Sequence, residues 1–468
     1  MISRRKALIA GVGGVAVVGA GVGAAALANR PKPEPPSPPS TDARGRLLWR
    51  NWSGIQHAYP QTRLAPQNEA ELATALPAAV AQFRPVGAGH SFTALVPTGG
   101  TLVSIDAISG IAGWDGDQAI VRAGTRLGAL GPALAAKGRA MANLPDINKQ
   151  SLAGALGTAT HGTGARLTAI HGDVTELALI TAEGSVVECS ATRRPEVFEA
   201  AKVSLGALGV VIEAKLRTIE NRRVRRRVWI EPFEETLAKS EARWAAHRNY
   251  EFYAVPFTDL AVAITHDETD DPVQPQGESQ DSAFLEALRS LRNLLGFSTP
   301  LRKRAARALL ADVEPETAVD EGWKLLSTER PERFNEMEYH LPVETHLAAL
   351  KEVVATIEKE RPDVFFPIEA RRIAPDEAWL SPFQGGPHGS IAVHAHYKDD
   401  FAFLYQLIEP IFLRHGGRPH WGKLHSLHGP QLAALYPRWN DFLEVRRELD
   451  PKGRMLNPDL FGLFGLQG

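Results

Sequence analysis

The chain has 468 residues, of which 44% are hydrophobic and 23% charged, and its formal net charge is −2. This length exceeds what one compact core can organise and indicates two domains with extensions. The charge shows no basic excess of the kind that nucleic-acid binding needs, and the single cysteine, Cys189, excludes an intramolecular disulfide and a multi-cysteine metal site.

The N-terminus is typical of a targeting segment. Three basic residues at positions 4–6 precede the uncharged stretch 7–28, which is rich in Ala, Gly and Val and ends in ALA. Residues 1–28 therefore predict a signal peptide of the twin-arginine kind. We expect export to the periplasmic or extracellular side, with a mature chain that starts near Asn29. An uncleaved membrane anchor is the alternative, because about 20 apolar residues suffice to span a bilayer.

The next stretch, residues 29–44, is rich in proline and polar residues and predicts a disordered linker. From 45 to 218, strand-like and helix-like segments alternate without a strict repeat, which is typical of an α+β domain. The hydrophobic spacing predicts helices over 69–80 and from 127 to a stop at Gly138, and strands over 101–106, 119–123, 174–180 and 185–189.

A second predicted domain covers residues 219–425. The basic run 222–227 (RRVRRR) indicates a solvated strand at the domain junction, and the acidic, Pro- and Gln-rich residues 267–281 indicate a loop. Helical material follows to about 311, and strands and helices mix from 321 to 424. Residues 426–468 predict helix and then coil.

Residues 84–92 (RPVGAGHSF) form the first candidate binding motif. Gly87 and Gly89 allow a tight turn whose N–H groups can face phosphate oxygens, and His90 follows them directly. A glycine-rich turn with a histidine is also common in ordinary loops, so this motif alone does not define a ligand.

Residues 146–164 (DINKQSLAGALGTATHGTG) form the second motif. They hold four glycines, no proline and several small hydroxyl residues, so we expect them not to pack as a core helix. A backbone without bulky side chains can approach a large ligand with many acceptors closely. A flexible surface loop is the alternative, but Leu152, Ala155 and Leu156 would need burial.

These two motifs belong to a larger set that resembles a known superfamily. Together with residues 121–127 (VRAGTRL) and 206–211 (GALGVV), they resemble the FAD domain of the vanillyl-alcohol oxidase or p-cresol methylhydroxylase (PCMH) superfamily. The aldonolactone and alditol oxidases have motifs similar to residues 369–371 (EAR), 420–423 (HWGK) and 449–458 (LDPKGRMLNP). The likeness runs from about Leu47 to Phe464 and is weakest from 267 to 329.

The resemblance implies an α+β fold. A two-subdomain PCMH-type FAD-binding domain spans 45–218, an α+β substrate or cap domain spans 219–425, and residues 426–468 return to the FAD domain. The implied cofactor is FAD, bonded covalently through His90. Further residues implied to contact FAD are Gly87, Ala88, Gly89, Ser91, Phe92, Asp146, Ser151, Gly154, Thr158, Thr160, His161, Gly162, Val211 and Ile212.

On the substrate side, the resemblance implies three catalytic residues. Glu369 and Arg371 match an acid–base and flavin-polarising pair, and Lys423 matches a residue near flavin N1. Positive charge there stabilises the reduced flavin, and we expect it to keep Glu369 ionised. Taken without the resemblance, Glu369 and Arg371 indicate an ordinary ion pair on one strand face. The residues implied to line the substrate pocket are His394, His396 and His420.

The sequence predicts no metal site. His394 and His396 are metal-ligand types at strand spacing, but no third ligand can be identified. We expect a small-molecule substrate and no nucleic-acid partner. We expect association with a membrane only if residues 1–28 stay attached as an anchor.

The favoured reaction is oxidation of a CH–OH group on an aldono-1,4-lactone such as arabinono- or gulono-lactone. An alditol such as xylitol or sorbitol is the alternative substrate. A non-catalytic, exported flavin-binding protein is the alternative class, and the intact motifs argue against it. Pro145 stands where the family usually has Gly or Ala, close to where oxygen arrives. The electron acceptor, oxygen or another, therefore stays open.

Overall fold

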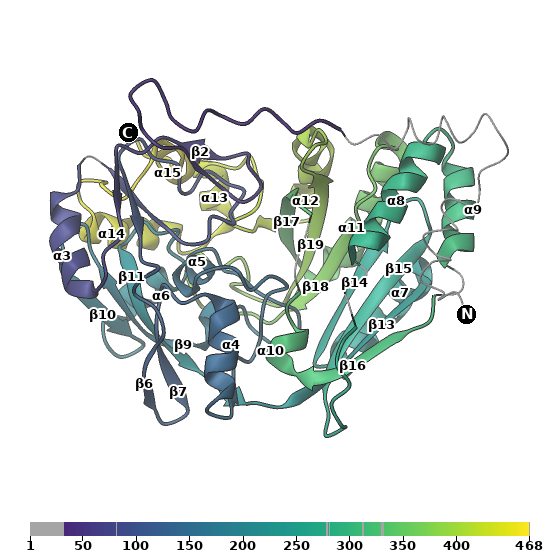
Figure 1. The fold of residues 1–468 in the computed structure, drawn as a ribbon, viewed down its shortest axis with the longest axis horizontal. Coiled ribbons are helices and arrows are strands. Elements are labelled where there is room, and N and C mark those ends of the chain that lie inside the picture. Colours follow the sequence, from purple (N-terminus) through teal and green to yellow (C-terminus); the bar gives the residue numbers. More distant parts are fainter. Residues whose placement is uncertain are drawn as a thin grey trace.

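The computed structural model describes residues 32–467 except 81, 278, 280, 311–312 and 329–331. The predicted signal peptide or anchor at 1–28 lies outside these residues. No helix within the described ranges is long and apolar enough to cross a membrane. Helices and strands mix in two lobes (Figure 1), which confirms the predicted α+β class.

The first lobe is built on two sheets. A three-stranded parallel sheet has the order β3-β5-β4, and a five-stranded antiparallel sheet has the order β10-β9-β11-β7-β6. Their strands are β3 (Thr62–Leu64), β4 (Phe83–Val86), β5 (Thr101–Ser104), β6 (Ile111–Asp115), β7 (Gln118–Arg122), β9 (Val174–Ile180), β10 (Val186–Ser190) and β11 (Val210–Arg217). The lobe also contains α3 (Glu69–Ala78), α4 (Leu127–Ala135), α5 (Leu152–Gly157), α6 (Pro195–Lys202), the 3-10 turn Ile170–Asp173, and the strand pairs β1 (Trp49–Arg50) with β2 (His57–Ala58) and β8 (Arg139–Ala140) with β12 (Ile219–Glu220).

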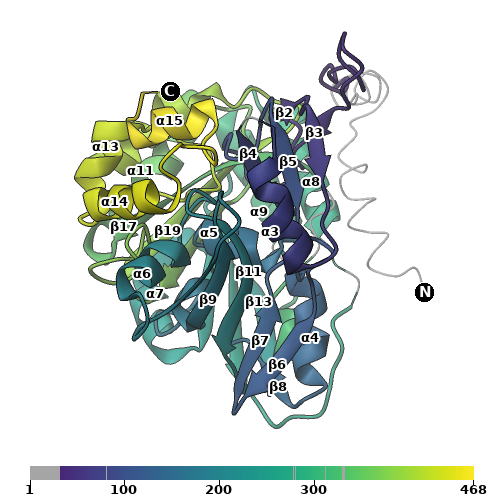
Figure 2. The same cartoon turned by 90° about the vertical axis from the view of Figure 1, so that its left-hand side faces the viewer.

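The C-terminal helices pack on this first lobe. They are α13 (Gly429–Leu435), α14 (Trp439–Leu449) and α15 (Pro458–Phe464), and Figure 2 shows them beside α6. Trp439 and Phe442 of α14 belong to the same buried apolar cluster as the five-stranded sheet. Buried Arg84 on β4 donates Nε–H to the carbonyl of Leu95 at 2.7 Å and also hydrogen-bonds the carbonyl of Met455, which ties the C-terminal segment to β4.

The second lobe is one antiparallel sheet in the order β16-β13-β15-β14-β18-β19-β17-β20. Its strands are β13 (Arg223–Pro232), β14 (Asn249–Val255), β15 (Leu260–Glu268), β16 (Glu316–Glu321), β17 (Phe334–Pro342), β18 (Ile368–Ile373), β19 (His388–His396) and β20 (Arg418–Pro419). The helical elements are α7 (Phe233–Ala246), α8 (Asp281–Leu295), α9 (Thr299–Leu310), α10 (Gly322–Leu325), α11 (Val343–Glu360), the π-helical turn Leu404–Ile408 and α12 (Glu409–Arg414).

The two faces of this sheet differ in character because residues along a strand alternate between them. Tyr339 of β17 stacks on Phe412 of α12 with ring centroids 5.1 Å apart, so this face is covered by helices. Glu338, its neighbour, points to the opposite face and lies 3.1 Å from His161 of the first lobe. The polar face of the second lobe is therefore turned toward the first lobe.

Most of the predicted helices and strands are confirmed. The prediction for residues 146–164 is corrected, and the segment 32–44 makes contacts that the sequence did not predict. Residues 146–164 do form a short helix, α5, because Leu152, Ala155 and Leu156 are all buried and can share one helix side. Residues 32–44 contain no helix or strand, as expected for a linker, but Glu34 is held by Lys398 at 2.8 Å and Arg333 at 2.9 Å on the second lobe. Figure 1 shows this purple segment running along the upper edge from one lobe to the other.

Candidate active site

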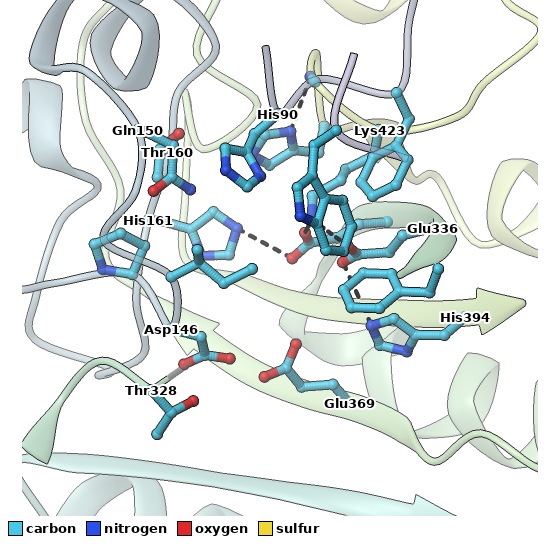
Figure 3. Close-up of a pocket in the computed structure, with 18 of the residues that line it drawn as sticks. His90, Asp146, Gln150, Thr160, His161, Thr328, Glu336, Glu369, His394 and Lys423 are labelled. Carbon is cyan, nitrogen blue, oxygen red and sulfur yellow. Dashed lines mark hydrogen bonds and ion pairs between the residues drawn. The ribbon is translucent and has the colours of Figure 1, made fainter. Parts of the chain in front are cut away.

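A cavity of about 690 Å³ lies between the two lobes and is lined by residues of both. Its size falls in the range of cofactor and substrate pockets, roughly 300–1,000 Å³. One part of the lining comes from the two glycine-rich motifs of the first lobe, and another comes from the polar face of the eight-stranded sheet (Figure 3).

Two glycines of the loop after β4 are required for different reasons, one by its backbone conformation and the other by close packing. Gly89 has a φ of +68°, and a Cβ on Gly87 would lie 2.1 Å from the Ser151 Oγ. Gly87 therefore lets the first motif pack against the second. The N–H of Trp52 donates to the carbonyl of Gly89 at 2.8 Å, and the Trp52 ring stacks with His90 at 5.4 Å. These contacts fix His90 on the cavity wall.

The second motif lines the cavity with hydroxyl and amide groups. Ser151 caps α5 by accepting from the N–H of Gly154 at 3.3 Å, and the hydroxyls of Thr158 and Thr160 lie 3.4 Å apart. The buried Gln150 Oε1, which also faces this wall, has no hydrogen-bond partner among the described residues. Close glycine backbone, hydroxyls and an orphaned acceptor fit a large ligand with many polar atoms, as FAD is.

Five charged residues meet on the second-lobe side of the cavity. Arg371 Nη2 lies 2.6 Å from Glu338 Oε1 and 3.2 Å from Glu369 Oε2. Lys423 Nζ pairs with Glu336 and lies 3.9 Å from Glu338 Oε2. Strand pairing explains the convergence, because Glu369 and Glu338 both pair with Ala392 of β19 and so share one face of the sheet.

The pKa values of the two carboxyls beside Arg371 are shifted in opposite directions. Burial alone would raise the pKa of Glu338, but Arg371 and then His161 bring it well below its ordinary value. Burial raises the pKa of Glu369 well above 4.5; Arg371 opposes this shift, while Asp146 and Glu251 add to it. The expectation that the nearby cations dominate the ionisation of Glu369 is therefore wrong in direction, because desolvation and two neighbouring carboxyls outweigh one guanidinium.

Glu369 belongs to a hydrogen-bonded group at the cavity floor. The Tyr253 hydroxyl donates to Glu369 Oε1 at 2.6 Å and to Asp146 Oδ2 at 3.3 Å. Asp146 Oδ2 is also 3.8 Å from Arg371 Nη1. Asp146, predicted as a cofactor contact, is the first residue of the second motif and faces Glu369 of the second lobe (Figure 3). This group can accept and hold one proton.

Two histidines of the cavity are neutral at ordinary pH. Burial, followed by the charge of Lys423, lowers the pKa of His90 to about 4. Burial also lowers the pKa of His420 well below 6.5. Ligand atoms of His161, Glu338 and His420 come within 4.8 Å of one another, as do those of Asp146, Glu251 and Glu369. Arg371 touches a member of each group, and its charge disfavours a cation at either.

Most of the predicted site residues line this one cavity, including Glu369, Arg371 and Lys423 from separate parts of the chain. The lining holds the predicted residues Gly87, Ala88, Gly89, His90, Ser91, Phe92, Asp146, Ser151, Gly154, Thr158, Thr160, His161, Val211, Glu369, Arg371, His394, His420 and Lys423.

Three predicted residues do not line the cavity. The pairing of β11 with β9 shifts register between Val211 and Glu213, and Ile212 lies in the apolar core of the first lobe. A Cβ on Gly162 would lie 2.2 Å from the carbonyl of Leu144, so Gly162 serves packing. His396 contacts Phe365 and Tyr397 near the end of β19.

Sequence reasoning missed Glu336, Glu338, Glu251 and Tyr253. All four lie in strands and line the cavity. Glu336 and Glu338 flank buried Met337, and this alternation indicates two carboxyls on one strand face. The alternation does not predict that this face of β17 is buried against Arg371 and Lys423, because those contacts depend on the register of strands that are distant in sequence.

Comparison with known proteins defines the class. A model of an FAD-binding domain matches residues 60–190. The fold resembles that of a cholesterol oxidase variant from Brevibacterium sterolicum, with a TM-score of 0.73 at 16% identity over 93% of this chain and 100% of that chain. Together with the glycine-rich cavity wall, the FAD-domain match and the lactone oxidase and dehydrogenase relatives define an FAD-dependent oxidoreductase that acts on CH–OH donors.

The family follows from closer relatives. L-Gulono-1,4-lactone dehydrogenase from Mycobacterium tuberculosis is 32% identical over 422 residues, which cover 88% of this chain and 97% of that protein. L-Gulonolactone oxidase from Scyliorhinus torazame is 27% identical over 425 residues, covering 87% and 96% respectively. A model of the D-arabinono-1,4-lactone oxidase family matches residues 214–461. The chain belongs to the D-arabinono-1,4-lactone oxidase family.

Proposed function

We propose that this protein oxidises a hydroxyl group of an aldono-1,4-lactone. The observation that carries the proposal is the group of buried Glu369, Arg371 and Glu338 with partly buried Lys423, which shares one cavity with the His90 loop. When bound, FAD supplies the acceptor for the hydride that leaves the substrate carbon. The names of the relatives support a lactone as the substrate, with an alditol as the alternative.

The protein's own residues handle the proton and the charge. Glu369 accepts the proton that leaves the substrate hydroxyl, and the Tyr253 hydroxyl, which donates to Glu369 Oε1, orients the carboxylate. A carboxyl with a raised pKa retains that proton better than an ordinary one, which suits a general base. Arg371 and Lys423 provide fixed positive charge beside the cavity, and preorganised charge stabilises developing negative charge without reorganising. Glu338 holds Arg371 in place at 2.6 Å.

The direct test is anaerobic mixing of the purified protein with a panel of lactones and alditols while the flavin absorbance is recorded. We expect aldono-1,4-lactones to bleach the flavin faster than alditols of similar size. If only alditols bleach the flavin, the substrate is a polyol and not a lactone. No bleaching by any member would contradict the proposed activity.

His90 is the proposed attachment point of FAD. The support is its place on the cavity wall, its stacking on Trp52 and a pKa near 4, which leaves the imidazole nitrogen unprotonated and able to form a bond. Acid-denatured protein should carry flavin fluorescence on a gel, and His90→Ala should lose it while remaining folded. Fluorescence that washes away from the wild-type band would rule out the bond.

The proposed electron acceptor is a molecule other than oxygen. Pro145 lines the cavity next to Asp146, and its carbonyl accepts from the Ser327 hydroxyl at 2.6 Å, so a rigid ring stands on this wall. We expect slow reoxidation of the reduced protein by air and fast reoxidation by a dye such as dichlorophenolindophenol. Pro145→Gly should speed the reaction with air. Fast air oxidation of the wild type would instead define an oxidase.

Export is proposed on sequence features alone, the basic residues 4–6 and the small residues 26–28. N-terminal sequencing of protein from the producing cell should return a start near Asn29. A start at Met1 would support the membrane anchor.

A further inference from the structure

Beyond the charged group, the cavity continues as a compartment that contains an apolar patch of the eight-stranded sheet. On the polar face of the eight-stranded sheet, Glu369 pairs with Tyr253, Tyr253 pairs with Val262, and Val262 pairs with Ile230. Directly paired residues share a face of the sheet. The row therefore changes from polar on β18 and β14 to apolar on β15 and β13, and all four side chains line the cavity.

The next row of the same face repeats this change. Glu251 of β14 pairs with Ile264 of β15, which pairs with Val228 of β13. The row after it pairs Arg226 with His266, both buried and polar, so the apolar area ends there. Val228, Ile230, Val262 and Ile264 thus form one apolar patch beside the proposed catalytic group.

Two helices add further apolar surface to this compartment. Ala283, Phe284 and Ala287 of α8 line the cavity, as do Leu309 and Leu310 of α9. Phe284 also packs against the buried core of the second lobe, which fixes α8. Both helices lie within residues 267–329, where the family resemblance is weakest. The compartment is therefore partly built by the segment in which the resemblance is weakest.

The chemistry of the walls selects the ligand. A free sugar lactone or alditol carries oxygen on nearly every carbon, and a hydroxyl buried without a hydrogen-bond partner costs free energy. Aliphatic side chains at Val228, Val262 and Ile264 offer such a hydroxyl no partner. An alkyl or aryl group would gain free energy from leaving water in the same place.

We infer that the substrate is amphiphilic, with a lactone or polyol head at Glu369 and an apolar alkyl or aryl substituent in the compartment formed by β13, β15, α8 and α9. This inference rests on the proposed function and specifies its substrate class. Each methylene that enters the compartment should tighten binding by roughly threefold to fourfold, up to the length that the compartment holds.

The test uses gulono-1,4-lactone and its acetyl, butyryl, hexanoyl and octanoyl esters at the hydroxyl furthest from the ring. Rapid mixing with the oxidised holoenzyme gives the dissociation constant and the limiting rate of flavin reduction separately. Equilibrium dialysis with holoenzyme reduced beforehand by dithionite measures binding without turnover. We expect the dissociation constant to fall with chain length in both measurements.

Variants locate the effect. Replacing Val228 and Val262 together by Thr keeps the side-chain shape but adds hydroxyls, and Ala287→Leu fills the compartment from α8. Both changes should flatten the dependence on chain length. Leu301→Ser lies on the exposed side of α9, with Leu301 49% exposed and outside the cavity lining, and should keep the full dependence.

The outcomes separate this inference from the proposed function. Bleaching by the bare lactone with no tightening for longer esters would overturn the inference and leave the function standing. Bleaching by the longer esters alone would support it. An equal loss of chain-length dependence in Leu301→Ser would also overturn it, because the effect would then not arise in the compartment. If no lactone bleaches the flavin and no ester binds the reduced protein, both fail.

Discussion

Replacing Glu338 by Gln should strongly destabilise the protein, whereas the same change at Glu369 should not. Glu338 is buried and ionised, and it accepts hydrogen bonds from Arg371 at 2.6 Å and from the Ser390 hydroxyl, with His161 Nε2 at 3.1 Å. Glu338→Gln leaves the buried guanidinium of Arg371 without its nearest counter-charge. Removing one partner of a buried pair typically costs about 3–5 kcal/mol.

Glu369→Gln is the matched control because Glu369 contacts the same guanidinium. Its raised pKa means that folding costs the charged carboxylate free energy relative to the neutral form, and a neutral amide of nearly the same shape avoids that cost. For a domain of about 200 residues, a loss of 3–5 kcal/mol corresponds to a fall in Tm of roughly 6–20 °C. We expect such a fall at neutral pH for Glu338→Gln alone, measured by calorimetry on holoenzyme.

The pH dependence of the two variants should have opposite signs. The lowered pKa of Glu338 gives stability that is present above about 4.5 and is lost as the pH falls through the folded value. The raised pKa of Glu369 gives stability that is present below about 4.5 and is lost as the pH rises through the folded value. Relative to wild type, Glu369→Gln should therefore gain stability as the pH rises above 4.5. Equal falls in Tm for both variants at neutral pH would refute this division of roles.

Three further outcomes follow from the site. The anaerobic rate of flavin reduction should rise with pH as Glu369 ionises, and the midpoint of this rise should lie well above pH 4.5. A wild-type rate that does not change above pH 5 would exclude Glu369 as the base. Gly87→Ala should lower the FAD content, because the added Cβ would lie 2.1 Å from Ser151 Oγ. Adding Ser151→Ala should restore part of the FAD content. Full FAD content in Gly87→Ala alone would contradict the close packing of the two motifs. Lys423→Met should slow flavin reduction on the order of 100-fold with FAD still bound, and a change in KM alone would assign Lys423 to substrate binding.

Local sequence patterns predicted the parts of the site that depend on nearby residues. The turn at Gly87 and Gly89 and the small residues around Ser151 are properties of short segments, and the structure packs these two segments together. Three motif residues from distant positions, Glu369, Arg371 and Lys423, line one cavity. This prediction depended on the family resemblance, because the spacing of Glu369 and Arg371 alone indicates only an ordinary ion pair on one strand face.

The parts that sequence could not predict depend on the register of distant strands. Glu338 reaches Arg371 because β17 and β18 both flank β19, and no local pattern encodes that order. The raised pKa of Glu369 arises from burial beside Asp146 and Glu251, which come from other elements. The same limit applies to Ile212, which a register shift in β11 leaves in the core.

The limiting rate of anaerobic flavin reduction in Glu369→Gln tests the central claim most directly. Saturating gulono-1,4-lactone is mixed with holoenzyme in a stopped-flow instrument, and the wild type and the variant are compared at neutral pH. Loss of a general base predicts a limiting rate lower on the order of 100-fold or more, with FAD content and Tm retained. A limiting rate within a few fold of wild type, at equal FAD content, would show that Glu369 does not accept the substrate's proton.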